Sequence, residues 1–217
     1  GWAAALPEAY GKPAYLAREA TGFIRRHRGR PWMLFVNFLE PHSPYTGPRD
    51  GQYDPMQLPV GPAFLHPPDA TNTLKARVRA AQARHQGLVS ESDWRALRAR
   101  YWGLCSLVDT HAGAILDELH ATGQSDRTIV VFTSDHGDMM GDHELLAKTF
   151  MFEPSVRVPL LIRAAGQTQA GHISRPVSQI DVVPTLLQLL GVSVPAECQG
   201  RSLVPELRGS VPADPDP

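Results

Sequence analysis

The chain has 217 residues, of which 42% are apolar, and its net charge at neutral pH is −1. This length suits one large domain, or one domain plus an appendage, and the apolar content suffices for a buried core. The near-zero charge gives no reason to expect nucleic acid or an anionic membrane surface as a partner. No apolar run approaches the roughly 18 residues that a membrane span requires, so no span is expected.

The first predicted element is a helix over residues 13–28. Pro13 suits a first turn, apolar side chains recur at helical spacing, and Gly29 ends the helix. The basic cluster at residues 25–30 is expected to be the solvated end of this helix, because cations suit a helix C-terminus and nothing extends the patch.

Residues 32–39 form a nearly unbroken apolar run that predicts an interior strand. His42 follows, held between two prolines that stiffen its loop. The alternative is a proline-rich turn with an incidental histidine. Residues 46–70 are rich in Pro, Gly and Asp and predict a long surface excursion, a common wall of binding sites. A basic, solvated helix is expected over 71–86.

Ser90 and Asp93 form a capping box before a long amphipathic helix that Gly123 ends. A second apolar run, residues 129–132, follows and predicts a central strand buried on both faces. The alternation of helices and interior strands favours an α/β fold. Toward the C-terminus we expect a third strand over 158–163, in which Pro159 favours either the beginning of the strand or an edge of the sheet, and a helix over 182–190 capped by Asp181.

The strand at 129–132 ends on Ser134-Asp135-His136-Gly137, which places a carboxylate and an imidazole at the carboxyl end of a core strand. Ligands bind at this edge of open α/β sheets. Such oxygen and nitrogen donors suit a divalent cation. For an isolated Asp-His pair, a turn-capping Asp135 beside a satisfied His136 is the simpler interpretation, so the pair needs support from other segments.

That support comes from a resemblance. Residues 128–163, TIVVFTSDHGDMMGDHELLAKTFMFEPSVRVPLLIR, closely resemble the core signature of the sulfatases, members of the alkaline-phosphatase-like superfamily. Four further blocks occur in the family's order: FVNFLEPHSPY, YWGLCSLVD, IDVVPTLL and GRSL. Together the five blocks cover roughly residues 30–45 and 95–208.

The resemblance implies a role for four residues. Asp135 and His136 match ligands of the active-site metal, Ca²⁺ or else Mn²⁺. Lys148, 13 positions past Asp135, matches the lysine that reaches the sulfate oxygens, and His42 matches the histidine that contacts the sulfate and protonates the leaving oxygen. A metal and an ammonium together neutralise a tetrahedral anion, and an imidazole can supply a proton near neutral pH.

The family's nucleophile, a formylglycine made within a Cys/Ser-x-Pro/Ala-x-Arg motif, has no match at Cys105 or Cys198, and two further acidic metal ligands are also absent. The resemblance therefore implies an alkaline-phosphatase-like, mostly parallel sheet flanked by helices and present as a partial domain. We expect residues 1–210 to be part of a sulfatase catalytic domain that has no turnover alone, and residues 211–217 to be a disordered tail.

The expected function is hydrolysis of a sulfuric ester, with a small-molecule or carbohydrate sulfate as substrate. A phosphonate or phosphate ester hydrolase of the same superfamily is an alternative, because a phosphoryl anion asks for the same metal, lysine and histidine. A non-catalytic remnant of the fold is another, and a cooperative melting transition of the isolated chain would favour it. The alcohol of the substrate, the compartment and the oligomeric state are left open by the sequence.

Overall fold

A computed structural model describes residues 6–67, 74, 77, 78, 81, 87–167 and 170–209 of the protein. It divides into two units: residues 1–125 with 136–158 form unit 1, and residues 126–135 with 159–217 form unit 2. Each unit is described by itself. The expected tail, residues 211–217, and nearly all of the expected helix at 71–86 lie outside the described residues.

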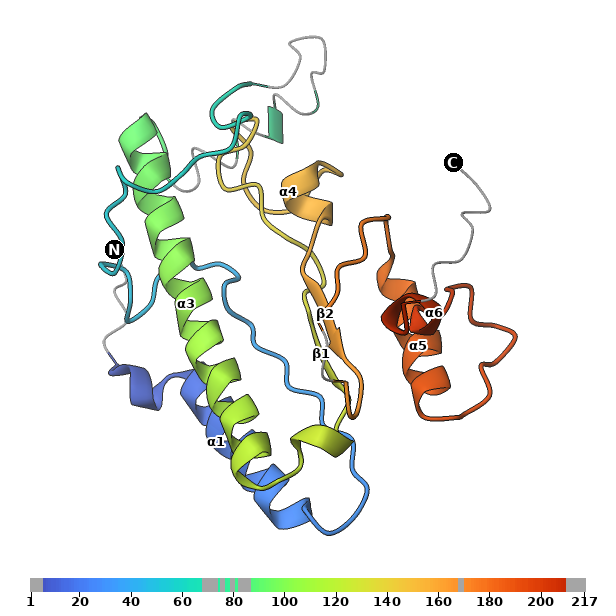
Figure 1. Ribbon diagram of the computed structural model, residues 1–217. Helices are drawn as coiled ribbons and strands as arrows, with labels where there is room; N and C mark the ends of the chain where they lie inside the picture. The colour runs from blue at the N-terminus through green and yellow to red at the C-terminus, as the bar shows by residue number, and fades with distance from the viewer. Residues whose placement is uncertain are drawn as a thin grey trace. The chain divides into compact units, whose positions relative to one another are not determined.

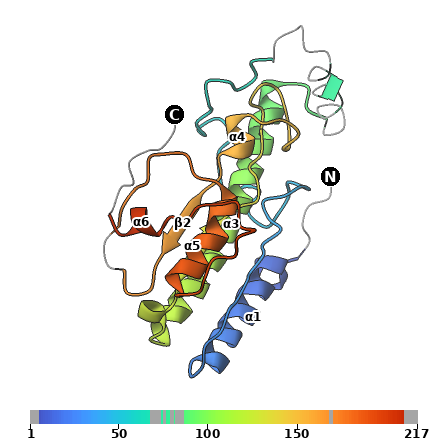
Figure 2. The same ribbon diagram turned by 90° about the vertical axis from the view of Figure 1, so that its right-hand side faces the viewer.

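Unit 1 is built on two helices that lie side by side in both ribbon views (Figure 1, Figure 2): α1, Lys12–His27, and α3, Glu91–Ala121. A short 3-10 helix, η1, Glu8–Tyr10, precedes α1. The face of α1 that is buried is made mainly of small residues, which allow a close approach of the two helices: Ala14, Ala17, Ala20 and Ile24.

The ends of α3 confirm the sequence prediction. Ser90 accepts a hydrogen bond from the backbone N–H of Asp93 at 3.2 Å, and the Asp93 carboxylate accepts one from the Ser90 N–H at 2.8 Å. This reciprocal pair satisfies two of the donors that a helix start leaves open. Gly123, with φ of 65°, follows the helix in the left-handed region that glycine favours. The 3-10 helix η2, Ser125–Arg127, comes next.

A buried amide joins three segments of unit 1 beyond the end of α3. The Gln124 side chain is 2% exposed, accepts a hydrogen bond from Trp32 Nε1 at 3.1 Å and donates one to the Ile24 carbonyl at 3.2 Å. Because a buried polar group is costly unless it is paired, these bonds hold the segment after α1 against the end of α3.

The hydrophobic core of unit 1 lies around the start of α3. Trp94 and Leu97 of the helix pack there with residues from three loops and from the segment just before the helix. The other buried members of this cluster are Tyr45, Phe64, Leu88, Met140 and Leu146. The core therefore joins the loop after His42, the excursion and the loop before Lys148 in one apolar cluster. A single helical turn, α4, Glu153–Val156, completes the unit.

Residues 32–39 differ from the interior strand predicted for them. The structure assigns them no strand, and their exposure alternates: Met33 and Phe35 are more than four-fifths exposed, whereas Leu34 and Val36 are partly buried. The alternation is the period of an extended chain. The prediction of burial on both faces was wrong, because within the described residues only two other segments pair as strands.

Unit 2 contains that strand pair, β1, Val130–Thr133, and β2, Leu160–Arg163. The two strands are antiparallel, with Val130 opposite Arg163 and Thr133 opposite Leu160. The α/β class is confirmed, but the described pair does not show the expected parallel pairing. Burial of β1 on both faces is also wrong, since Phe132 is 42% exposed. A two-stranded sheet cannot enclose either of its strands as a larger layered sheet does.

The helices of unit 2 follow the strands: η3, Gln179–Asp181, α5, Val182–Leu189, and α6, Val204–Leu207. The sequence predicted that the Asp181 side chain caps α5, but it makes no capping hydrogen bond to that helix. Its carboxylate instead accepts from the Ser178 N–H and the Arg201 N–H, both at 2.9 Å. Asp181 and Ser178 instead form a capping box at the start of η3. The side-chain cap therefore lies one short helix earlier than predicted.

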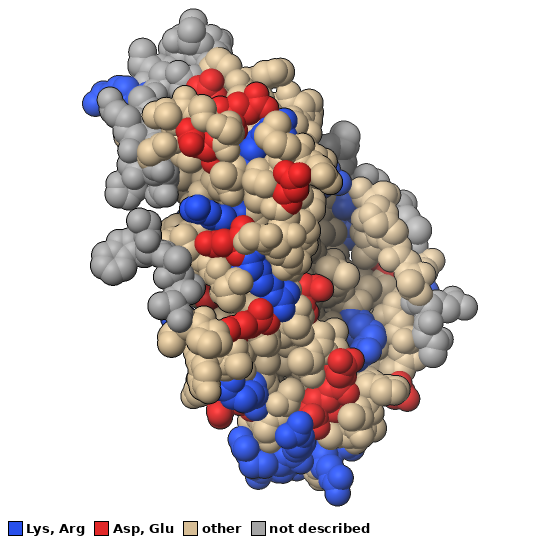
Figure 3. All heavy atoms as spheres, turned by 90° about the vertical axis from the view of Figure 1, so that its left-hand side faces the viewer, with Lys and Arg blue, Asp and Glu red and all other residues tan. Residues whose placement is uncertain are grey.

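No helix in the described part of the chain is both long and apolar enough to cross a membrane. The face drawn in Figure 3 carries Lys and Arg side chains among acidic ones, with cations gathered at one end. The basic residues around the end of α1, Arg25, Arg26, Arg28 and Arg30, are exposed, as expected for a solvated helix end.

Candidate functional site

The loop that runs from His136 to Lys148 in unit 1 carries two of the predicted site residues and has a strained backbone. Four residues other than glycine adopt positive φ, each at a cost of about 1–3 kcal/mol: Met140, His143, Glu144 and Ala147. Such clusters persist only where surrounding contacts hold them, and they concentrate at functional sites. Met139, 1% exposed, and Leu145, fully buried, anchor the loop from inside.

His136 begins this loop, and its ring is oriented by its own backbone. Its Nδ1 lies 2.8 Å from the carbonyl oxygen of Gly137. Because a carbonyl only accepts, Nδ1 carries the proton, and in the neutral ring Nε2 carries the lone pair. Histidines that bind metals are oriented in this way, with the second nitrogen donating to a carbonyl or carboxylate.

Gly137 allows the turn to pass close to α4. Its N–H donates to the Ser155 carbonyl at 2.8 Å, and a Cβ at position 137 would stand 2.0 Å from the carbonyl oxygen of Pro154. Since the obstacle is backbone, no side-chain rotation relieves the clash. The glycine of the Ser-Asp-His-Gly turn is therefore required by packing.

Asp135 belongs to unit 2, at the end of the segment that contains β1. It is exposed, and its Oδ1 lies 3.4 Å from the Ser134 hydroxyl. The amide nitrogen of Gln179, in η3, donates to the Ser134 carbonyl at 2.5 Å and to the Asp135 carbonyl at 2.9 Å. Two bonds from one amide thus hold the end of this strand within its own unit.

His42 lies in the loop after the extended segment of unit 1. Its ring is exposed, and Nδ1 donates to the Ser43 carbonyl at 2.8 Å, which again leaves the lone pair on Nε2 of the neutral ring. Three residues later the chain enters the core at Tyr45, 5% exposed. Burial, followed by the hydrogen bond to Asp138, raises the pKa of Tyr45, so its hydroxyl stays a donor.

Asp138 is the residue that the sequence analysis missed. Its Oδ2 accepts from the Tyr45 hydroxyl at 2.6 Å, and its Oδ1 accepts from the Ala147 N–H at 2.9 Å and the Met140 N–H at 3.2 Å. Lys148, which is exposed, directly follows Ala147. The only signal for Asp138 in the sequence was its place directly after the Asp-His-Gly triplet. That place does not indicate partners as far along the chain as Tyr45.

The excursion predicted at 46–70 contacts the same loop where it is described. Leu65 N–H donates to the Gly141 carbonyl at 2.9 Å, and His143 N–H donates to the Ala63 carbonyl at 2.8 Å. Arg98 of α3 donates to the Met140 carbonyl at 3.1 Å. The excursion is thus packed as a wall against the loop that ends at Lys148.

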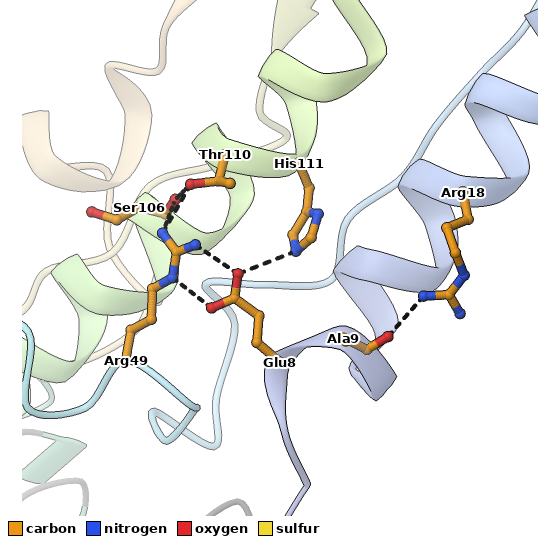
Figure 4. Close-up of polar contacts among 7 residues, drawn as sticks. All are labelled: Glu8, Ala9, Arg18, Arg49, Ser106, Thr110 and His111. Carbon is orange, nitrogen blue, oxygen red and sulfur yellow. Dashed lines mark hydrogen bonds and ion pairs between the residues drawn. The ribbon is translucent and has the colours of Figure 1, made fainter. Parts of the chain in front are cut away.

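A second anchor holds the start of the excursion to α3 and η1 (Figure 4). Arg49 donates from Nε and Nη2 to the two carboxylate oxygens of Glu8, at 2.8 and 2.6 Å, and from Nη1 to the Ser106 carbonyl and the Thr110 hydroxyl. The hydrogen bond from Arg49 lowers the pKa of Glu8. His111 Nε2 stands 3.6 Å from Glu8. Paired bonds of this charge-assisted kind fix orientation as well as distance.

Asp135 and His136 offer donors of the kinds that the metal expected from the resemblance requires. The oriented His136 ring fits a ligand, and the exposed Asp135 carboxylate supplies a hard oxygen. Within the described residues, however, no group of three or more His, Cys, Asp or Glu side chains is placed to hold a metal ion. Each of the two side chains is of a type that binds such a metal, and their role as ligands stays a prediction.

The structure therefore groups three of the four predicted residues in unit 1. His136 and Lys148 stand at the two ends of one loop, and His42 stands on the loop whose Tyr45 bonds to Asp138. Asp135 stands in unit 2. The catalytic and metal roles of all four remain predictions.

The α/β architecture, with a Ser-Asp-His-Gly turn after a strand, is the fold of the alkaline-phosphatase-like superfamily, as the family model and the solved structures similar to it indicate. The chain belongs to the sulfatase family, whose family model matches residues 6–192.

Individual relatives carry more than one activity in their names. The chain is 33% identical over 96% of its length to the multifunctional alkaline phosphatase superfamily protein PehA of Trinickia caryophylli, covering 44% of that protein. It is 35% identical over 83% of its length to the choline-sulfatase of Rhizobium meliloti, covering 36%. The phosphonate monoester hydrolase of Silicibacter pomeroyi superimposes with a TM-score of 0.86 at 28% identity, over 96% of this chain and 44% of that one. The chain spans less than half the length of these three proteins.

Proposed function

We propose that this chain supplies part of the active site of a metal-dependent hydrolase that cleaves sulfuric esters. The observation that carries the proposal is the loop from His136 to Lys148, whose strained backbone presents an oriented imidazole at one end and an exposed ammonium at the other. Membership of the sulfatase family supports this role for the loop.

Each residue has a distinct role in the proposal. Asp135 and His136 would hold a divalent cation, Ca²⁺ or Mn²⁺, which when bound supplies positive charge next to the oxygens of the ester. Lys148 binds a second oxygen of the same anion and stabilises the charge that develops there. His42 keeps its Nδ1 proton on the Ser43 carbonyl, and in the imidazolium form it carries a second proton on Nε2, which it gives to the leaving oxygen to return to the neutral ring.

The nucleophile has no counterpart among these residues, because neither Cys105 nor Cys198 stands in the formylglycine motif of the family. The ester is expected to be a small-molecule or carbohydrate sulfate, and the described part of the excursion, packed against residues 141–143, is positioned to shape its alcohol side.

A second candidate is hydrolysis of phosphonate or phosphate esters. It is favoured by the TM-score of 0.86 to a phosphonate monoester hydrolase and by the similarity to PehA. A tetrahedral phosphoryl anion makes the same demands on the metal, Lys148 and His42, so these residues do not separate the two substrates.

The test compares p-nitrophenyl sulfate with p-nitrophenyl phosphate and p-nitrophenyl phenylphosphonate, which share one leaving group. The polypeptide from the complete reading frame that contains residues 1–217 is assayed beside the 217-residue chain, with added Ca²⁺ or Mn²⁺. We expect kcat/KM to be highest for the sulfate and the 217-residue chain to show no turnover. A higher value for the phosphonate establishes the second candidate, and no hydrolysis of any ester by the complete polypeptide overturns both.

Variants connect the activity to the loop. Lys148→Met keeps the length of the side chain and removes its charge, and it should lower kcat/KM by about 10²–10³-fold, as loss of one charge-stabilising group does. Lys12, an exposed lysine at the start of α1, offers the matched control, and Lys12→Met should leave kcat/KM unchanged. Equal rates for the parent and Lys148→Met would remove this residue from the mechanism.

A further inference from the structure

The carboxylate of Asp138 lies where the three functional segments of unit 1 meet. It accepts one hydrogen bond from the loop after His42, through Tyr45, and one from Ala147, the residue before Lys148. It follows His136 by two positions along the chain. No other side chain for which the structure gives hydrogen bonds joins these segments in this way.

The bonds from Asp138 close the strained loop. Its Oδ1 bonds to backbone N–H groups near both ends, at Met140 and Ala147, and the Met139 N–H donates to the Ala147 carbonyl at 2.9 Å. Ala147 has φ of 62° and would relax to an ordinary backbone conformation if nothing held it. Consecutive Cα atoms are about 3.8 Å apart, so the position of Ala147 sets where the Lys148 side chain starts.

The hydrogen bond from Tyr45 to Asp138 also fixes the position of the loop that carries His42. Tyr45 is buried in the core cluster, and its ring packs edge-on against Tyr101 at 6.2 Å between centroids. The hydroxyl therefore has little freedom to seek another acceptor. The 2.6 Å bond to Asp138 links the loop of His42 to the loop of Lys148 through one carboxylate.

We propose that Asp138 is a positioning residue that holds Lys148 and His42 at their separation for the ester anion, without itself contacting metal or substrate. The proposal rests on the proposed function for the identity of the anion, but its structural part does not. Both Asp138 oxygens are engaged by donors of the protein, which is the arrangement of a bracing group.

Two substitutions of Asp138 distinguish a positioning role from a role that requires its negative charge. Asp138→Asn keeps an acceptor oxygen for the two N–H groups and can pair with Tyr45 through its amide, since a phenol both donates and accepts. Asp138→Ala removes all three bonds. Replacing a metal ligand would weaken Mn²⁺ binding in both variants, because both lose the carboxylate charge, whereas a positioning residue is largely rescued by Asn and leaves Mn²⁺ binding unchanged.

The first readout is hydrogen exchange of the Ala147 and Met140 amides in the 217-residue chain, which requires no activity. Asp138→Ala should accelerate their exchange about 10–100-fold, as the loss of a hydrogen bond to a charged group implies, and Asp138→Asn by much less. Asp142→Ala is the matched control in the same loop and should leave the Ala147 amide unchanged. Unchanged exchange in Asp138→Ala overturns the proposal, whatever the enzyme's substrate is.

The second readout uses the complete polypeptide with the preferred ester. Asp138→Ala should lower kcat/KM about 10²-fold, the effect of displacing reacting groups by about 1 Å, while Asp138→Asn stays within about 10-fold of the parent. The Mn²⁺ concentration at half-maximal activity should not change in either variant. Equal losses in both variants, or weaker Mn²⁺ binding, would make Asp138 a ligand and overturn the positioning role. Tyr45→Phe, which keeps the packed ring, should fall between parent and Asp138→Ala.

Discussion

Two glycines of α3, ten residues apart, provide a test of how closely the excursion approaches this helix. A Cβ at Gly103 would stand 2.4 Å from the Arg49 carbonyl oxygen and 3.0 Å from its carbonyl carbon. A Cβ at Gly113 would meet nothing within 4 Å. The same substitution, Gly to Ala, therefore clashes with backbone at one position and enters open space at the other.

The two substitutions are expected to change the free energy of unfolding differently. Alanine is favoured over glycine inside a helix by about 1 kcal/mol, and this gain applies at both positions. Overpacking in a filled interior costs about 1–3 kcal/mol. At Gly103 the obstacle cannot rotate away, because Arg49 is held by both oxygens of Glu8 and by α3. Gly103→Ala should thus be neutral to about 2 kcal/mol less stable than the parent, and Gly113→Ala about 1 kcal/mol more stable.

The assay is urea unfolding followed by far-ultraviolet circular dichroism, which reports mainly on helices. The parent and both variants are measured side by side, and the unfolding midpoints are compared. The expected order is Gly113→Ala, then parent, then Gly103→Ala, with about 1–3 kcal/mol between the extremes. If both variants gain stability equally, the close approach of Arg49 to α3 is absent in solution and the anchor of the excursion is wrong.

Three further outcomes are expected. Arg49 lowers the pKa of Glu8, so the stability that this pair contributes is present above the unfolded pKa of about 4.3 and is lost as pH falls through the folded value; the midpoint difference between parent and Glu8→Gln should be constant above about pH 5 and shrink in more acidic solution. Thr185→Val removes the buried hydroxyl that accepts from the Leu203 N–H, and thermal unfolding should show a loss of about 1–3 kcal/mol. Phe35→Ser removes a side chain that is 82% exposed, so binding of an apolar fluorescent dye should fall while the far-ultraviolet spectrum stays unchanged; an unaltered dye signal would argue against an exposed apolar face.

Elements with local signals were predictable from the sequence. The capping box at Ser90 and the stop at Gly123 placed α3 within one or two residues. Pro159 correctly placed β2 as a strand beginning just after it. Each of these signals lies within a few residues of the boundary that it sets, which is why a single sequence suffices.

Features that depend on remote partners were not predictable. An apolar run reports that a segment avoids water but does not report which segment covers it, so residues 32–39 were wrongly expected to be an interior strand. Asp138 was overlooked for the same reason, because its partner Tyr45 lies 93 residues away. Of the candidate site, the sequence and the resemblance supplied the four predicted residues, and only the structure supplied the hydrogen bonds of Asp138 that link the loops of His42 and Lys148.

The two backbone bonds between the excursion and the loop that ends at Lys148 bear on how this protein can change. Leu65 N–H donates to the Gly141 carbonyl and His143 N–H donates to the Ala63 carbonyl, so an altered excursion displaces the loop that ends at Lys148 with it. Under the proposed function, selectivity for the alcohol and turnover of the ester would then not evolve independently. Laboratory evolution toward a new substrate should enrich paired changes, one on each segment, rather than isolated substitutions at the wall.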